Sequence, residues 1–144
     1  MILELFATAC AGFFSGAALY ISVVQHPASL QLGTAAATRF FAPMYARAAP
    51  LQASLAGLGV VAGAAVWWSG GGWPWLLGAL LLGAVIPFTM IVIMPTNSRL
   101  KDPALDAASP EAAALLRRWG TLHAVRSVAS GLAFLTFLYA MARG

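Results

Sequence analysis

Residues Trp75–Met94 read WLLGALLLGAVIPFTMIVIM, an apolar stretch without a single charged side chain. A helix that crosses about 30 Å of hydrocarbon, at about 1.5 Å per residue, needs roughly 20 predominantly apolar residues. This stretch has that length. It lacks the alternation of a strand, and hydrocarbon offers no partner for open backbone groups. We therefore expect a membrane-spanning helix here.

Three further apolar stretches accompany it, at about residues 3–24, 51–68 and 122–141. The chain is 61% hydrophobic and only 8% charged, whereas about 25% of residues are charged in ordinary globular proteins. This composition argues against a soluble enzyme, and we expect the lipid bilayer as a partner and no nucleic acid. The sequence predicts an all-α fold, a single integral membrane domain over residues 1–144 built as an antiparallel transmembrane four-helix bundle.

Basic residues predict how this bundle is oriented. Four antiparallel spans place the long connections, residues 25–50 and 95–121, on one side, and the Ser69–Pro74 hairpin and both termini on the other. The long connections contain Arg39, Arg47, Arg99, Lys101, Arg117 and Arg118, whereas Arg143 lies on the opposite side. Cytoplasmic loops are enriched in Lys and Arg. We therefore expect cytoplasmic long loops and both termini on the non-cytoplasmic side of a bacterial inner membrane.

Prolines predict where the helices are interrupted. We expect His26, which precedes Pro27, to lie beyond the regular first helix, and Pro87 to break the third span. Pro43 and Pro50 are expected to kink any helix that leads into the second span. Residues 95–108 are expected to form a loop.

Other local signals predict a helix start and close helix contacts. Ser109 before Pro110 and Glu111 has the pattern of an N-cap serine, a first-position proline and an acid in the first turn. A helix from there could continue into the fourth span. The G-x-x-x-G pairs Gly12–Gly16 and Gly59–Gly63 are typical of helices that pack closely in lipid.

Polar side chains gather at the predicted inner ends of all four spans. On the fourth span, Trp119, His123 and Arg126 follow one another at i, i+4 and i+7, so they share one helix face. Candidates from the other three spans and their approaches are Tyr20, His26, Tyr45, Arg47, Gln52, Thr89, Thr96 and Asn97. Ionisable groups at membrane depth are costly and indicate a functional site by default.

Each of these residues also has a structural interpretation. Arg126 could extend to the interface as an orientation signal. Thr96 and Asn97 could cap the third helix, and Thr89 could bond a carbonyl that Pro87 frees. What favours a site is the ensemble of polar groups at one depth.

Several chemistries fit these residues poorly. Two imidazoles do not complete a metal site, and Asp102, Asp106 and Glu111 lack ligand spacing, so we expect no metal. No carboxylate lies at mid-membrane, where proton-coupled transport usually places one. Cys10 has no neighbouring base that would make it a nucleophile.

The interpretation that fits best is a polar, cationic pocket for an anionic or phenolic organic molecule. His123 would act as the base, and Arg126 with Asn97 would stabilise an oxyanion. A heme held by His26 and His123 stays open as an alternative.

Five segments carry a resemblance to a known family. They are G-A-A-L-Y at Gly16–Tyr20, H-P at His26–Pro27, Y-A-R at Tyr45–Arg47 with Gln52 after it, P-F-T-M-I-V-I-M-P-T-N at Pro87–Asn97, and W-G-T-L-H-A-V-R at Trp119–Arg126. Over about residues 5–140 the chain resembles the anthrone oxygenase family of small four-helix membrane proteins. Fungal members are associated with oxidising an anthrone to an anthraquinone, without an evident dedicated metal or flavin motif.

The resemblance implies roles for three residues and no cofactor. His123 and Arg126 match the family's L-H-x-x-R segment, and Asn97 matches its P-T-N segment. The implied chemistry is removal of an acidic phenolic or benzylic proton, so that the carbanion reacts with dioxygen. The alternative is a non-enzymatic membrane bundle that binds a lipid, a quinone or a heme, or that assists a partner membrane protein. The oligomeric state stays open.

Overall fold

Four helices, each long and apolar enough to cross a membrane, form the fold in the computed structural model, which describes residues 1–143. The segments, in chain order, are α1 (Ile2–Tyr20), the π-helical η1 (Ile21–Gln25), α2 (His26–Gln31), α3 (Thr34–Trp68), α4 (Trp73–Phe88), the π-helical η2 (Thr89–Ile93), α5 (Met94–Leu100) and α6 (Pro110–Arg143). The first three are continuous and make the first long helix, and α4, η2 and α5 make the third. The all-helical prediction and the four apolar spans are confirmed.

The helices run further than the sequence predicted. His26 begins α2 inside the first long helix, so the prediction that it lies beyond the regular helix was wrong. Residues 94–100 are helical rather than a loop. Pro43 and Pro50 lie inside α3, and Pro87 lies inside α4, without ending either helix.

Two of the tolerated prolines follow π-helical segments. Pro27 lies just after η1, and Pro95 lies just after η2. A proline lacks the N–H donor of the helical ladder and its ring crowds the preceding turn. A wider π turn relieves that crowding and requires no donor at the proline. The helix therefore continues where the sequence pattern predicted its end.

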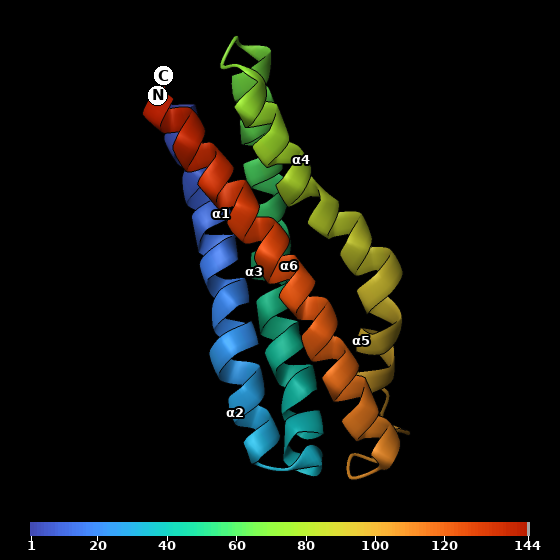
Figure 1. The fold of residues 1–144 in the computed structure, drawn as a ribbon. Helices are drawn as coiled ribbons and strands as arrows, with labels where there is room; N and C mark the ends of the chain where they lie inside the picture. Colours follow the sequence, from blue (N-terminus) through green and yellow to red (C-terminus); the bar gives the residue numbers. More distant parts are fainter. Residues whose placement is uncertain (144) are drawn as a thin grey trace.

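The connections lie at two opposite ends of the bundle (Figure 1). Both termini and the short turn after Trp68 lie at one end, and the turn between α2 and α3 lies at the other with the loop between α5 and α6. The α1 helix packs on α3 and α6, and α4 packs on the same two helices. Below this contact, the chain from α4 through η2 to α5 bends away from α3.

The half of the bundle near the termini is packed around Phe137. This side chain is fully buried, stacks on Trp75 with 5.2 Å between ring centroids, and lies against Gly63 and Gly78. A Cβ atom at either glycine would overlap its ring. Small residues therefore bring α3, α4 and α6 together. Gly16, by contrast, faces open space, so only part of the predicted G-x-x-x-G pattern makes helix contacts.

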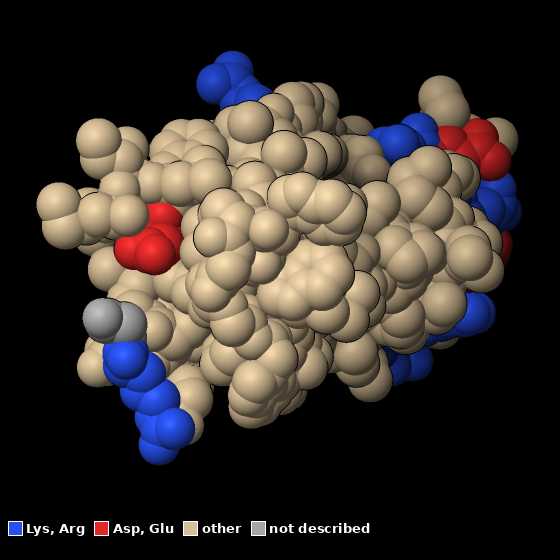
Figure 2. Space-filling model, turned by 90° about the horizontal axis from the view of Figure 1, so that it is seen from above, with Lys and Arg blue, Asp and Glu red and all other residues tan. Residues whose placement is uncertain are grey.

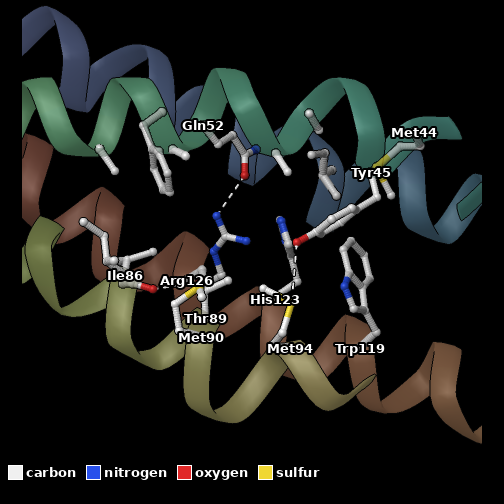
Figure 3. Close-up of a pocket in the computed structure, with 17 residues that line it drawn as sticks. Met44, Tyr45, Gln52, Ile86, Thr89, Met90, Met94, Trp119, His123 and Arg126 are labelled. Atoms are coloured by element: carbon white, nitrogen blue, oxygen red, sulfur yellow. Dashed lines mark hydrogen bonds between the residues drawn. The ribbon is translucent and has the colours of Figure 1, made fainter. Parts of the chain in front are cut away.

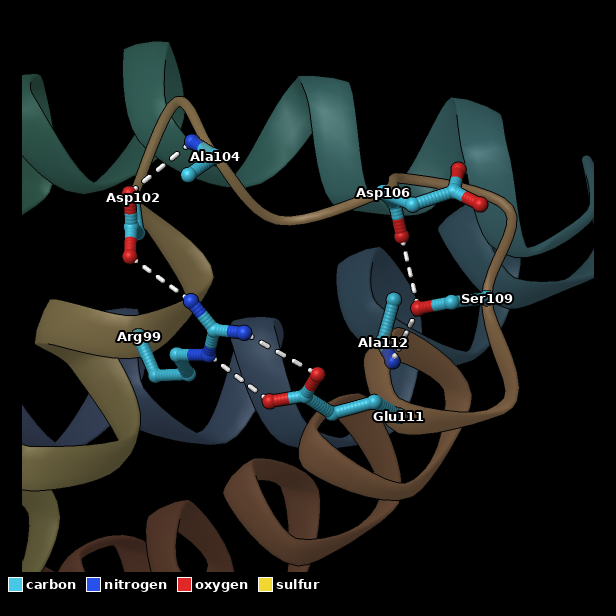
Figure 4. Close-up of polar contacts among 7 residues, drawn as sticks. All are labelled: Arg99, Asp102, Ala104, Asp106, Ser109, Glu111 and Ala112. Atoms are coloured by element: carbon cyan, nitrogen blue, oxygen red, sulfur yellow. Dashed lines mark hydrogen bonds and ion pairs between the residues drawn. The ribbon is translucent and has the colours of Figure 1, made fainter.

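Ion pairs and a helix cap hold the opposite end of the bundle (Figure 4). Arg99 of α5 makes two hydrogen bonds to Glu111 of α6, of 2.7 and 3.0 Å, and one of 2.7 Å to Asp102. The pKa of Asp102 is lowered because its carboxylate accepts the N–H of Ala104 and faces the Arg99 guanidinium. Ser109 accepts the N–H of Ala112 at 3.1 Å, so the predicted start of the last helix is confirmed.

Seen from above, at the end with the termini, most of the visible surface is uncharged (Figure 2). Large apolar side chains point outward along the spans, such as Ile91 and Val128, which are 74% and 63% exposed. In water such a surface would be unstable, whereas lipid solvates it. The described chain is therefore built to lie in a bilayer.

Candidate functional site

A cavity of about 150 Å³ lies between the four long helices, on the side where η2 bends away from α3 (Figures 1 and 3). An apolar cavity of this size holds about one benzene ring. Its wall is mostly apolar, with Phe14, Ile21, Met44, Met90 and Met94 among the side chains that form it. Its polar groups come from α3, η2 and α6: Tyr45, Gln52, Thr89, Trp119, His123 and Arg126.

The cavity has its mouth on the lipid-facing surface. Ile86 and Met90 line it and are also 43% and 59% exposed. Ala53 of α3 lines it from across the mouth and is exposed as well. An apolar molecule dissolved in the bilayer could therefore enter between α3 and the α4–η2 segment without passing through water.

Arg126 places a buried positive charge at the cavity. Its Nη2 donates a hydrogen bond of 2.9 Å to Oε1 of Gln52, and its guanidinium carbon lies 5.5 Å from the centre of the Phe14 ring. Only 9% of Arg126 is exposed. Within residues 1–143, its guanidinium has no carboxylate within ion-pair distance, and Nε of Arg126 and Nε2 of Gln52 have no hydrogen-bond partner. The site thus presents a cation and unused N–H donors.

His123 lies one turn before Arg126 and also lines the cavity. Its Nδ1 is 2.9 Å from Oγ of Ser22 in η1, and that hydroxyl is 2.8 Å from Oγ of Ser127. The imidazole stacks on Trp119, with ring centroids 4.7 Å apart. These contacts hold the ring on two sides, so its orientation is defined by η1 and α6 together.

Trp119 separates the cavity from a second polar group. Its indole Nε1 donates to Oδ1 of Asn97 at 2.8 Å, and its ring meets His26 edge-on, with centroids 5.0 Å apart. Nε2 of His26 lies 3.1 Å from the carbonyl of Leu116. A Cβ atom at position 120 would lie 2.8 Å from that nitrogen, so Gly120 makes room for the imidazole. Asn97 and His26 therefore support Trp119 from behind.

The structure brings together most, though not all, of the residues that the sequence analysis selected. Tyr45, Gln52, Thr89, Trp119, His123 and Arg126 line the cavity. Asn97, Thr96 and His26 lie outside its lining; the first two are buried, and the Thr96 hydroxyl has no hydrogen-bond partner. Tyr20 is 57% exposed, Arg47 is exposed, and neither lines the cavity. Thr89 donates to the carbonyl of Val85, four residues before it, at 2.7 Å; this is not the carbonyl that Pro87 frees, which belongs to Gly83.

Sequence reasoning missed two kinds of site residue. One kind is the apolar wall, because methionine and alanine are unremarkable in a membrane helix. The other kind is the pair Ser22 and Ser127, which contact His123. A weak signal existed for both serines, since Ser127 follows His123 at i+4 and Ser22 precedes His26 at i−4 on predicted helices.

Among residues 1–143, no three His, Cys, Asp or Glu side chains lie close enough together to hold a metal ion. His26 and His123 both contact Trp119, which lies against each imidazole.

Comparisons with known proteins agree with the resemblance. The sequence model of the family described as anthrone oxygenase matches residues 39–136. A curated relative, "Anthrone oxygenase tpcL" of Aspergillus fumigatus, is 32% identical over 139 residues, which cover 89% of this chain and 86% of the relative. No solved structure matches the chain.

Proposed function

Because the chain belongs to the anthrone oxygenase family, we propose that it oxidises a small phenolic aromatic molecule of the anthrone type in the cavity beside His123 and Arg126. The observation that carries this proposal is the buried guanidinium of Arg126, which has neutral Gln52 as its hydrogen-bond partner. A buried cation without a counter-ion costs free energy. An anionic form of the substrate would supply the missing negative charge.

The chemistry proposed for these groups begins with proton removal. His123 takes an acidic proton from the ligand, and Arg126 stabilises the oxyanion that results. The electron-rich carbanion form of the ligand then reacts with dioxygen. In the overall reaction, a methylene carbon loses two hydrogens and gains one carbonyl oxygen, so that one O₂ yields one quinone carbonyl and one water.

Size and position of the cavity support a membrane-dissolved substrate. The cavity of about 150 Å³ accommodates one aromatic ring, and further rings would extend through the mouth between Ala53 and Met90. We propose that the substrate reaches the site laterally from the bilayer. We also propose that the end with the 101–109 loop is cytoplasmic, because Arg99, Lys101 and Arg117 lie near it.

The reaction proposed here uses no resident metal or heme. Nε2 of His26 faces the carbonyl of Leu116, and the Trp119 ring packs against both imidazoles. An iron bound between these two histidines would require Trp119 to move. An absorption spectrum of the purified protein tests this point, since a Soret band that disappears in His26→Ala would establish the heme alternative.

The test is anthrone oxidation by the purified protein in lipid nanodiscs, followed as quinone formation and as O₂ consumption. His123→Ala and Arg126→Ala are compared with Arg117→Ala, an exposed arginine on the same helix. We expect His123→Ala to lower kcat by roughly 10²- to 10⁴-fold, the usual contribution of a general base, while Arg117→Ala keeps the wild-type rate. Nanodiscs without protein correct for spontaneous oxidation.

Two results would overturn the proposal. Equal turnover by wild type, His123→Ala and Arg126→Ala would remove both residue roles. Absence of turnover, combined with binding of a quinone that depends on Arg126, would instead establish the non-enzymatic binding bundle.

A further inference from the structure

We propose that Ser22 and Ser127 are positioning residues that hold His123 in the Nδ1–H tautomer and leave the lone pair of Nε2 free on the cavity side. The role of that lone pair as a base rests on the proposed function. The tautomer itself does not, because it follows from the hydrogen bonds.

Each serine hydroxyl in this chain of contacts has one proton to donate. The Ser127 hydroxyl has one proton and lies 3.0 Å from the carbonyl of Ala18 and 3.2 Å from the carbonyl of His123. A carbonyl oxygen only accepts, so these two contacts are hydrogen bonds only if Ser127 donates its proton to a carbonyl. The 2.8 Å contact between Ser127 and Ser22 then needs the proton of Ser22. In that arrangement Ser22 has no second proton to offer His123, so Nδ1 donates to Ser22 across the 2.9 Å contact.

The opposite direction of this chain is less favourable. Ser127 would donate to Ser22, and Ser22 would donate to Nδ1 of His123. Two oxygens, Oγ of Ser127 and O of Ala18, would then face each other at 3.0 Å without a proton between them. In a buried, low-dielectric site this arrangement loses a hydrogen bond that the first arrangement keeps.

The π-helical segment of the first long helix explains how Ser22 reaches the histidine. Ser22 lies in η1, directly after α1 ends at Tyr20. The wider π turn changes the direction in which the following side chains point, and such segments are frequent at functional sites. Ser127 faces Ser22 from α6, one turn after His123.

This hydrogen-bond chain would also stabilise the protonated form of His123. When Nε2 accepts a proton from the ligand, the ring becomes an imidazolium with both nitrogens protonated. Nδ1–H continues to donate to Ser22, whose hydroxyl donates to Ser127, whose hydroxyl donates to Ala18. These hydroxyl dipoles are aligned with their negative ends toward the ring. Neutral hydroxyls thus fill the orienting role that a carboxylate has in many catalytic sites.

The other histidine provides an internal contrast. Nε2 of His26 faces the carbonyl of Leu116, which can only accept. His26 is therefore expected in the Nε2–H tautomer, opposite to His123. Since the chain contains only these two histidines, their signals can be assigned with one variant, His26→Gln.

The experiment measures the tautomers by ¹⁵N NMR of the full chain, labelled at histidine, in nanodiscs and with any purification tag removed. We expect a protonated Nδ1 and an unprotonated Nε2 for His123 in the wild type and in Ser22→Thr, which keeps the hydroxyl. Ser22→Ala should lose the preference for that tautomer. Ser15→Ala, the same substitution elsewhere on the first long helix, serves as the matched control and should keep it. In the activity assay, Ser22→Ala should lower kcat by roughly 10- to 100-fold, the range expected for losing a hydrogen bond to a charged group, and leave KM nearly unchanged.

The outcomes separate this inference from the proposed function. An Nε2–H tautomer in the wild type, or an Nδ1–H tautomer that persists in Ser22→Ala, would overturn the role of the serines even if His123→Ala abolishes activity. If the tautomers behave as expected but His123→Ala turns over at the wild-type rate, the positioning by serine stands and the proposed function fails.

Discussion

At the scale of single residues, burying the charge of Arg126 costs free energy of folding, whereas the proposed function gains a cation that binds an anionic ligand. Arg126 is 9% exposed, bonded to neutral Gln52, and without an acidic partner among residues 1–143. A buried, unpaired charge within a membrane bundle costs free energy, up to about 2.5–3.5 kcal/mol at the centre of a helix by insertion scales. Because Arg126 lines the cavity and its burial costs free energy, ligand binding explains its presence better than folding does.

Replacing this charge should therefore separate stability from binding. We expect Arg126→Met to leave the free energy of unfolding unchanged or raise it by about 1–3 kcal/mol, because the uncompensated charge is removed. Affinity for a phenolate should fall by roughly tenfold or more, the value of one charge-assisted hydrogen bond. Equilibrium unfolding in mixed micelles and ligand titration measure the two effects.

A second variant controls for the amide that Arg126→Met leaves without its partner. The double variant Gln52→Leu with Arg126→Met removes that amide as well and should be at least as stable as the single variant. A large loss of stability in the double variant, with phenolate affinity intact, would show that Arg126 serves folding instead.

Residue patterns predicted part of the site and missed the rest. The i, i+4, i+7 spacing of Trp119, His123 and Arg126 predicted one shared face, and all three line the cavity. Ser22 went unnoticed because a serine in an apolar helix ordinarily bonds its own backbone. Only its 2.9 Å contact with Nδ1 of His123 distinguishes it.

At the scale of helices, the contact between α4 and α6 depends on the absence of a side chain at Gly78. Gly78→Ala would place a Cβ atom in the ring of Phe137, which is fully buried and stacked on Trp75. Overpacking of this kind costs about 1–3 kcal/mol. We expect that loss in the free energy of unfolding in mixed micelles, with partial recovery when Phe137→Leu is added.

Gly16→Ala is the matched control for this substitution. Position 16 has open space around its Cβ direction, and alanine is favoured over glycine in a helix by about 0.5–1 kcal/mol. Stability should stay the same or rise slightly. Equal losses at Gly16 and Gly78 would mean that the Phe137 contact does not decide the packing.

Proline patterns alone did not predict where these helices end. Pro27 and Pro95 read as helix ends because each lacks a donor and disfavours a helical residue before it. In the structure, π-helical segments precede both, and the helices continue through His26 and Asn97. Whether a proline ends a helix depends on neighbouring helices that compensate its missing hydrogen bond, which no local pattern contains.

At the scale of the whole molecule, the proposed orientation can be tested with single cysteines. Native Cys10 is buried at 4% exposure and should not react with a membrane-impermeant maleimide. In intact spheroplasts we expect Ser69→Cys to be labelled and Ala108→Cys to be protected, because these exposed positions lie at opposite ends of the bundle. Permeabilised cells should label both. The reverse pattern in intact spheroplasts would invert the orientation derived from the basic residues.

The amino-acid sequence by itself determined three properties of this protein. They are its suitability for a lipid bilayer, its four apolar spans, and the helix face that carries His123 and Arg126. These properties depend on length, hydropathy and local periodicity, which can be read from consecutive residues without knowing the fold. Tertiary structure decided which polar residues meet. It placed Gln52 on Arg126 and Ser22 on His123, left Tyr20 at the surface, and set Asn97 behind Trp119. Such pairings depend on the rotation of each helix about its axis, and packing contacts such as Phe137 against Gly78 set that rotation.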